Sequence, residues 1–435
     1  NQSGKNGTAG NYNVFMGYNT GFNNTASNNV FLGYECGLNN TTGTNNAFVG
    51  YKAGRSNTTG SSNVIIGDNA GYSNITGGNN VFLGYYAGYT NNASNNVFLG
   101  FEAGRQNTTG TNNAFMGYLA GRSNTTGSSN VIIGDNAGFT NTSGIQNVFL
   151  GKNAGYTNNA SNNVFLGFEA GRQNTTGTNN AFMGYLAGRS NTTGSSNVMI
   201  GDNAGYTNTT GIQNVFLGKN AGYNNNASNN VFLGFEAGWQ NTTGTNNAFM
   251  GYLAGRSNTT GSSNVMIGDN AGYANTTGIQ NVFLGKNAGY ANITGNNNVF
   301  LGYEAGYNNK DWNNVFIGYY SGRSNNTGDG NVFLGYYSGY NNSTGDENTF
   351  IGTGAGQLNT TGNYNVYLGR SAGYSSANSS ASYNVCLGYE AGRFISDGEK
   401  NSFIGYRAGM NNTSGYSNVF MGNNAGFNNQ NGYSN

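Results

Sequence analysis

The chain repeats one five-residue phrase, Asn-Val-Phe-Leu-Gly or a close variant, from one end to the other. Its closing glycine recurs 25 times between Gly17 and Gly422, most often at intervals of 17 residues and otherwise mainly of 16. A unit this short cannot bury a core alone and is typical of solenoids, in which repeats stack on one another. The repeat therefore outweighs the two or three globular domains that 435 residues would otherwise suggest.

A second period, four units long, overlies the first. The segments Phe101–Gly167 and Phe168–Gly234 each contain four units and differ at only four aligned positions. Tandem duplication of a four-unit block is the simplest origin of this pattern.

Each unit favours a short β-strand followed by turns. The Val-Phe-Leu run is β-prone, and asparagine and glycine on either side favour turns. Three glycines per unit argue against a helix, and the absence of proline fits coils in which each backbone N–H bonds to a neighbouring coil. We predict an all-β fold, a parallel β-solenoid of about 25 coils that forms one elongated domain over 1–435. Asparagine and threonine at fixed positions should stack into ladders.

Alternation along the strand predicts which side chains face inward. In the coil that begins at Asn96, Val97 and Leu99 share one face and Phe98 lies on the other. We expect Val97, Leu99 and the small Ala103 to line a narrow interior, which leaves a phenylalanine column exposed. Such a stripe must be covered, so the column is a candidate self-association surface; the alternative is that the rings pack inside a wider coil. The column includes Phe15, Phe31, Phe48, Phe82, Phe98, Phe115, Phe149 and Phe165.

Composition excludes several function classes. With no histidine there is no imidazole relay or imidazole metal ligand, and 17 basic against 16 acidic residues leave no basic surface for nucleic acid. No apolar stretch reaches the roughly 18 residues of a membrane span. Most features occur many times, whereas an active site needs a unique constellation. We expect no enzyme activity, no cofactor, no metal site and no membrane span.

Asn-x-Ser/Thr sequons occur about once per unit. They are candidate N-glycosylation sites of an extracellular protein, although asparagine beside glycine also forms turn hydrogen bonds. Examples are Asn57, Asn107, Asn174 and Asn342. Adjacent threonines such as Thr125-Thr126 suggest an ice-binding array as a minor alternative, but neighbours on an extended segment point apart.

Four aspartates recur once in every four units, in the sequence Gly-Asp-Asn-Ala-Gly, and are expected to be solvated turn residues, too far apart to share an ion; they are Asp68, Asp135, Asp202 and Asp269. Cys36 and Cys386 lie 21 coils apart, roughly 100 Å, so they cannot pair within one rod. They either cross-link neighbouring subunits or pack in the core.

One stretch, 370–400, departs from the repeat. The interval from Gly369 to Gly388 is longer than every other interval between closing glycines, and the insert contains Ser375, Ser376, Ser379 and Ser380. The turn that follows, Arg393–Lys400, has the densest charge in the chain. Irregular loops on a regular scaffold often bind ligands, and drift within the array is the alternative.

The repeated strand phrase followed by a small-residue turn resembles the head repeats of trimeric autotransporter adhesins. It is also similar to repeats of bacterial surface fibres and phage tail fibres. The resemblance implies a β-roll of three chains packed side by side that binds host matrix or surfaces. The unit here is longer than in that family, and its strand centre is phenylalanine instead of a small residue.

Neither end of the sequence shows a capping element, which is expected either of a fragment or of subunits that stack end to end. Together these observations predict an extracellular structural filament at the cell surface that associates with copies of itself in adhesion or biofilm cohesion. A trimeric adhesin or phage-type receptor-binding fibre is the alternative.

Overall fold

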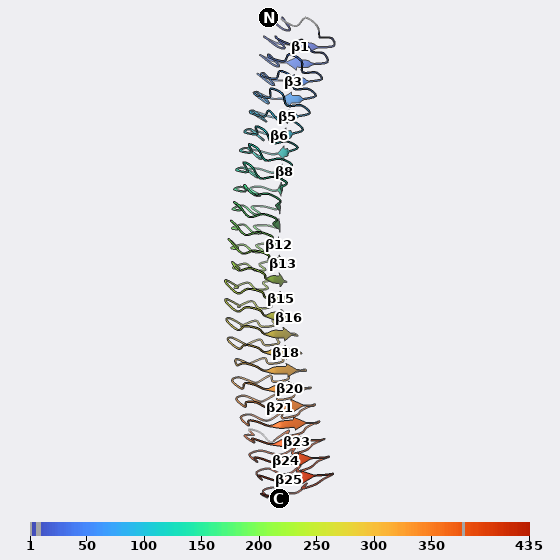
Figure 1. Cartoon of the computed structure of the whole chain (residues 1–435), viewed down its shortest axis with the longest axis vertical. Coiled ribbons are helices and arrows are strands. Elements are labelled where there is room, and N and C mark those ends of the chain that lie inside the picture. The colour runs from blue at the N-terminus through green and yellow to red at the C-terminus, as the bar shows by residue number, and fades with distance from the viewer. Residues whose placement is uncertain (1, 6–9, 376–378) are drawn as a thin grey trace. The chain divides into compact units, whose positions relative to one another are not determined.

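The computed structural model describes residues 2–5, 10–375 and 379–435, and within them it is all-β. Contacts divide the chain into two compact units, residues 1–214 and residues 215–435. Each unit is a parallel β-solenoid in which every coil contributes one strand of three residues (Figure 1). The described residues contain no helix long and apolar enough to cross a membrane.

The described part of the first unit contains β1 (Val14–Met16), β2 (Val30–Leu32), β3 (Ala47–Val49), β4 (Val64–Ile66), β5 (Val81–Leu83), β6 (Val97–Leu99), β7 (Ala114–Met116), β8 (Val131–Ile133), β9 (Val148–Leu150), β10 (Val164–Leu166), β11 (Ala181–Met183) and β12 (Val198–Ile200). The described part of the second contains β13 (Val215–Leu217), β14 (Val231–Leu233), β15 (Ala248–Met250), β16 (Val265–Ile267), β17 (Val282–Leu284), β18 (Val299–Leu301), β19 (Val315–Ile317), β20 (Val332–Leu334), β21 (Thr349–Ile351), β22 (Val366–Leu368), β23 (Val385–Leu387), β24 (Ser402–Ile404) and β25 (Val419–Met421).

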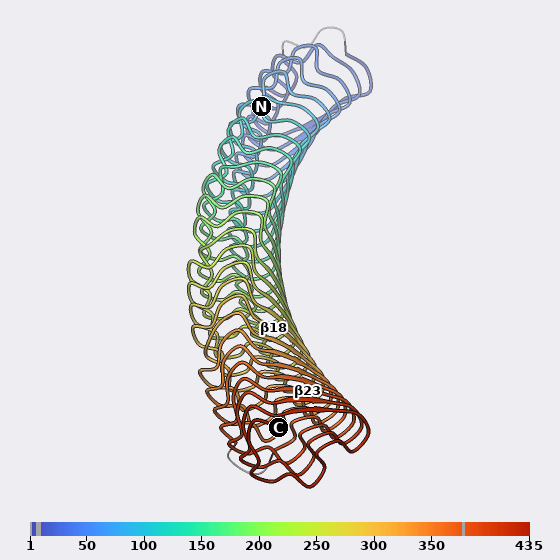
Figure 2. The ribbon, with the colours of Figure 1, turned by 60° about the horizontal axis from the view of Figure 1, so that its bottom comes forward.

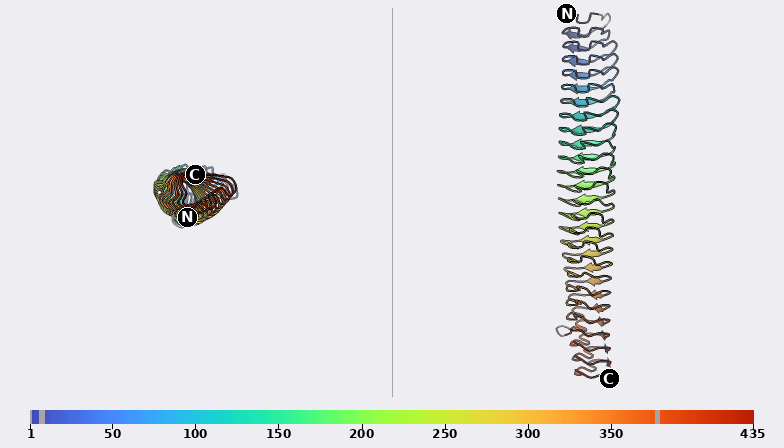
Figure 3. Two further views of the ribbon diagram at one scale, coloured as in Figure 1. Left: turned by 90° about the horizontal axis from the view of Figure 1, so that it is seen from below. Right: turned by 90° about the vertical axis from the view of Figure 1, so that its left-hand side faces the viewer.

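Within each unit, every strand pairs in parallel with the strand of the next coil. The register places equivalent repeat positions opposite each other, as where Phe98 of β6 faces Phe115 of β7. The strands of a unit therefore line one side of the stacked coils (Figures 2 and 3). The predicted solenoid, its parallel pairing and the length of its repeat are confirmed.

The phenylalanine column forms the core of the coils, so the prediction that it is an exposed self-association column is wrong. The rings stack on one another, with centroids 4.9 Å apart for Phe98 and Phe115. Phe15, in the first described strand, is half-buried. The other residues of the predicted column are completely buried: Phe31, Phe48, Phe82, Phe98, Phe115, Phe149 and Phe165. The alternative, that the rings pack within the coil, is the one the structure shows.

Small residues on the opposite wall of the coil explain this inversion. Ala103 is buried as predicted, and a Cβ on Gly104 would lie 2.7 Å from the ring of Phe98. The wall therefore leaves room for a flat ring and has no bulk of its own to fill that space. Val97 and Leu99 point the other way and stay partly exposed.

Two buried asparagine ladders complete the interior and confirm the predicted stacking of asparagines. In the ladder before the strands, the Asn113 N–H donates to Asn96 Oδ1 at 3.0 Å, and Asn113 Nδ2 donates to the Gly127 carbonyl at 2.8 Å. In the ladder at the far turn, Asn124 Nδ2 donates to Asn107 Oδ1 at 2.6 Å. Buried amides thus bond in both directions along the stack, which satisfies groups that would otherwise be costly to bury.

Candidate functional site

The outer face of each sheet is aliphatic. The first and third residues of each strand project away from the coil, and they are mostly valine in the first position and leucine, isoleucine or methionine in the third. Val131 and Leu150, for example, keep 37% and 38% of their surface exposed. We call the surface formed by these two columns the aliphatic face. It continues from coil to coil within each unit, and it is made of the valine and leucine positions that the sequence analysis placed inside the coil.

A third column lies beside the aliphatic face. It consists of the residue directly after the closing glycine of each strand phrase, and we call it the corner column. In order, its members are Tyr18, Tyr34, Tyr51, Asp68, Tyr85, Phe101, Tyr118, Asp135, Lys152, Phe168, Tyr185 and Asp202 in the first unit. In the second they are Lys219, Phe235, Tyr252, Asp269, Lys286, Tyr303, Tyr319, Tyr336, Thr353, Arg370, Tyr389, Tyr406 and Asn423.

Aromatic members of the corner column stack between coils. The rings of Phe101 and Tyr118 are 5.3 Å apart and nearly parallel, and Phe235 and Tyr252 repeat the arrangement at 5.4 Å. These rings remain substantially exposed, 41% for Phe101 and 52% for Tyr118. They are available for contact with another surface, which the buried phenylalanines are not.

Arginine–glutamate pairs connect neighbouring coils. Arg122 Nε lies 2.6 Å from Glu102 Oε2 of the preceding coil, and Arg256 also lies over the ring of Trp239 at 4.6 Å. Bonding to Glu35 raises the pKa of Arg55, so its charge is secure at every physiological pH. The equivalent pairs are Glu35–Arg55, Glu169–Arg189, Glu236–Arg256, Glu304–Arg323 and Glu390–Arg407. These charges are already partnered within the chain and do not form an open binding site.

The four candidate glycosylation sites are buried, so the structure contradicts that prediction for the folded chain. Asn57, Asn107, Asn174 and Asn342 are all inaccessible and belong to the ladder at the far turn. Asn57 Nδ2 donates to Asn40 Oδ1 at 2.6 Å and to the Gly60 carbonyl at 2.9 Å. Glycosylation would require an exposed amide nitrogen. The turn-bonding alternative accounts for these residues.

The threonine pairs also bond within the coil stack. Thr125 Oγ1 donates to the Thr142 carbonyl of the next coil at 2.9 Å. In the preceding coil, Thr108 Oγ1 donates to the Thr125 carbonyl. The first hydroxyl of each pair therefore helps to hold coils together. This engagement weakens the argument for a free hydroxyl array that would order ice.

The carboxylates of the described residues do not form a group of three or more ligands that could hold a metal ion. Asp68 and its three equivalents in the corner column are each separated by four coils. In the second unit, the Asp329 N–H donates to Asp346 Oδ1 at 3.0 Å. Burial, with Asp346 and Asp311 nearby, raises the pKa of Asp329.

Both cysteines are buried free thiols, so neither is positioned for the cross-link between subunits that the sequence left open. Cys36 occupies the alanine position of its coil, and Cys386 occupies the core position that phenylalanine fills in most other coils. Burial raises the pKa of Cys36 to about 12, and it raises the pKa of Cys386 as well. Packing is the role that the structure gives them.

We expect the native chain to resist thiol alkylation. At pH 8 a thiol with a pKa near 12 is only about one part in ten thousand thiolate, and both sulfur atoms lie out of reach. Mass spectrometry after iodoacetamide treatment should show no adduct in buffer and two adducts in guanidinium chloride. Rapid double labelling of the native chain would contradict the buried positions.

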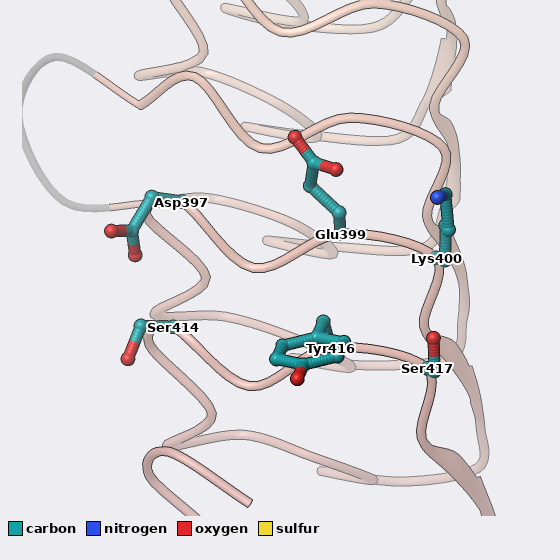
Figure 4. Close-up of a pocket in the computed structure, with 6 residues that line it drawn as sticks. All are labelled: Asp397, Glu399, Lys400, Ser414, Tyr416 and Ser417. Atoms are coloured by element: carbon teal, nitrogen blue, oxygen red, sulfur yellow. The ribbon is translucent and has the colours of Figure 1, made fainter. Parts of the chain in front are cut away.

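A shallow pocket of about 250 Å³ lies in the second unit, between the charged turn Arg393–Lys400 and the coil that follows it. Figure 4 shows the side chains that line it stacked over two consecutive coils, with Asp397, Glu399 and Lys400 above Ser414, Tyr416 and Ser417. All six residues are exposed. The serine-rich insert was the other candidate for ligand binding in this stretch. Of its serines, Ser376 lies outside the described residues, whereas Ser375 and Ser379 are buried.

The chain matches no protein-family model and no curated protein.

Proposed function

We propose that the chain is a structural protein of an extracellular fibre, which acts in adhesion or surface cohesion by associating laterally with copies of itself. The observation that carries the proposal is the aliphatic face. Soluble monomers rarely expose a continuous apolar patch larger than a few hundred Å². Here two aliphatic columns continue from coil to coil in both units. Burial against another copy would remove that surface from water.

The internal chemistry supports a mechanical role over a catalytic one. The asparagine ladders, the ring stack and the arginine–glutamate pairs each bond one coil to the next. These interactions repeat along the chain. The polar and charged side chains that an enzyme would use for chemistry here bond one coil to the next. The resemblance to adhesin and surface-fibre repeats supports placing the chain outside the cell.

Sedimentation velocity between 1 and 100 µM tests the proposal. We expect assemblies heavier than the 45.5 kDa chain, with a mass that grows with concentration. A species of 45.5 kDa at every concentration would overturn the proposal.

The matched variant carries Val131→Thr, Val148→Thr and Val164→Thr. Thr349 and Ser402 already occupy this position in β21 and β24, so the fold accepts a hydroxyl there. Threonine keeps the β-branched shape and removes apolar surface from the aliphatic face. We expect weaker association with an unchanged circular dichroism spectrum.

A receptor-binding fibre is the second candidate, because the pocket includes part of the densely charged turn Arg393–Lys400. Electron microscopy separates the two functions. Discrete particles three chains across would favour the receptor-binding fibre, and bundles that widen with concentration would favour the structural one.

A further inference from the structure

The corner column carries a charge pattern with a period of four coils. From Phe101 the order is aromatic, aromatic, acidic, basic, and it then begins again. The first unit contains this order as Phe101, Tyr118, Asp135, Lys152, Phe168, Tyr185 and Asp202, and the second continues it as Lys219, Phe235, Tyr252, Asp269 and Lys286. At roughly 4.8 Å per coil the pattern repeats about every 19 Å.

Lys152 and Asp135 of this column form an ion pair that remains open to solvent. Lys152 Nζ lies 3.6 Å from Asp135 Oδ2, with 56% and 41% of the two side chains exposed. An exposed pair of this kind contributes little to stability by itself. The Arg122–Glu102 pair nearby is shorter and less exposed. The charges of the corner column are thus the ones that another surface could engage.

We infer that two copies of the chain pack their aliphatic faces together with antiparallel axes, in a register set by the corner column. The inference rests on the proposed lateral association and adds its orientation. With a two-fold axis between the coils of Asp135 and Lys152, Asp135 of one copy faces Lys152 of the other. Tyr118 then faces Phe168, and Phe101 faces Tyr185.

The second unit gives the same result independently. A two-fold axis between the coils of Asp269 and Lys286 pairs these two residues across the contact. It also places Tyr252 opposite Tyr303, and Phe235 opposite Tyr319. Both units therefore have an interface that is complementary to itself, as an isologous contact requires.

Parallel axes lose this match. Two copies that pack their aliphatic faces with parallel axes are related by a two-fold axis along the fibre, which places their corner columns at opposite edges of the contact. A shift along the axis does not bring the two columns together, so Asp135 and Lys152 of one copy then meet no corner residue of the other. Only the antiparallel arrangement matches all four types of coil at once.

The available area suffices for a stable contact. Each coil presents two partly exposed aliphatic side chains and one corner residue, on the order of 150 Å² together. About five or six coils therefore reach the roughly 800 Å² per partner of a standard specific interface. In the first unit the register pairs six consecutive coils of the pattern, from Phe101 to Tyr185.

A charge-swap variant tests the orientation in the full chain. It exchanges the acidic and basic members of the corner column by Asp135→Lys, Lys152→Asp, Asp202→Lys, Lys219→Asp, Asp269→Lys and Lys286→Asp. With antiparallel axes the variant still pairs aspartate with lysine when it meets itself. Against the natural chain it sets aspartate against aspartate and lysine against lysine.

Association is measured by fluorescence-detected sedimentation with one partner labelled, at low salt, where exposed charges act most strongly. We expect the two self-associations to agree within about threefold and the mixed one to be at least tenfold weaker. A mixed association stronger than either self-association would show that like charges face each other in the natural contact, which overturns the inferred register. Equal strength in all three is the result expected of parallel axes, and it would overturn the inference while leaving the proposed assembly intact. Absence of any association for the natural chain would overturn the proposed function itself.

Discussion

Replacing Gly84 by alanine is expected to destabilise the first unit by about 3–5 kcal/mol, because two penalties combine at this residue. Gly84 closes strand β5 at a φ of +138°, a conformation that L side chains rarely adopt. A Cβ there would also press on the carbonyl group of Gly100 in the next coil, 2.7 Å from its carbon atom. That neighbour is backbone, so relief requires the two coils to separate, and their strand bonds break with them.

The matched control lies shortly before it in the same coil, at Gly78→Ser. Serine already occupies the equivalent positions of the adjacent coils, as Ser61 and Ser94. Guanidinium chloride unfolding followed by circular dichroism should show a large loss of stability for Gly84→Ala and a change within about 0.5 kcal/mol for the control. Hydrogen exchange should rise first in the coils on either side of Gly84. A Gly84→Ala chain as stable as the control would show that the coils can yield without breaking contact.

The stacking of coils could be predicted from the sequence because the period alone requires it. A three-residue strand that recurs at so short and regular an interval leaves its hydrogen bonds no partner except the same strand in a neighbouring repeat. The ladders follow from the same geometry, since identical side chains then lie one coil apart. Asn107 and Asn124 illustrate this, as do Phe98 and Phe115.

Strand alternation is symmetric, so it cannot predict which face of the strand lies inside the coil. It separates Phe98 from Val97 and Leu99 but does not say which side is buried. The sequence did contain a deciding signal. Ala103 and Gly104 are both small, and a wall of small residues leaves room for a ring.

Sequence reasoning also missed the charge order of the corner column. Asp135 and its equivalents form a series within one repeated motif, whereas Lys152 and the aromatic residues of the column lie in different motifs. Alignment of coils on the four-unit period would have revealed the order. The buried state of sequon asparagines such as Asn57 could not be found this way, because it depends on how the far turn folds against the core.

Asn174→Asp is expected to destabilise the first unit by about 4 kcal/mol or more at pH 8, because it places a carboxylate inside a hydrogen-bonded ladder. Asn174 is completely buried, and its Nδ2 donates to Asn158 Oδ1 at 2.6 Å and to the Gly177 carbonyl at 2.8 Å. An aspartate oxygen in place of that nitrogen faces two acceptors with no proton to give.

The loss should depend on pH in a defined direction. Burial and the two acceptors raise the pKa of the introduced carboxyl in the folded state above its unfolded value of about 3.9. The stability deficit is therefore smallest below pH 4, where both states are protonated, and grows as the pH rises through the folded-state pKa. Asn179→Asp makes the same substitution at an exposed residue of the same coil with a φ of +58°, which aspartate tolerates. Its unfolding free energy should stay within about 0.5 kcal/mol of the natural chain at both pH 4 and pH 8. If Asn174→Asp unfolds at the same denaturant concentration at both pH values, the ladder accommodates a charge and the buried amides are not what holds the far turns together.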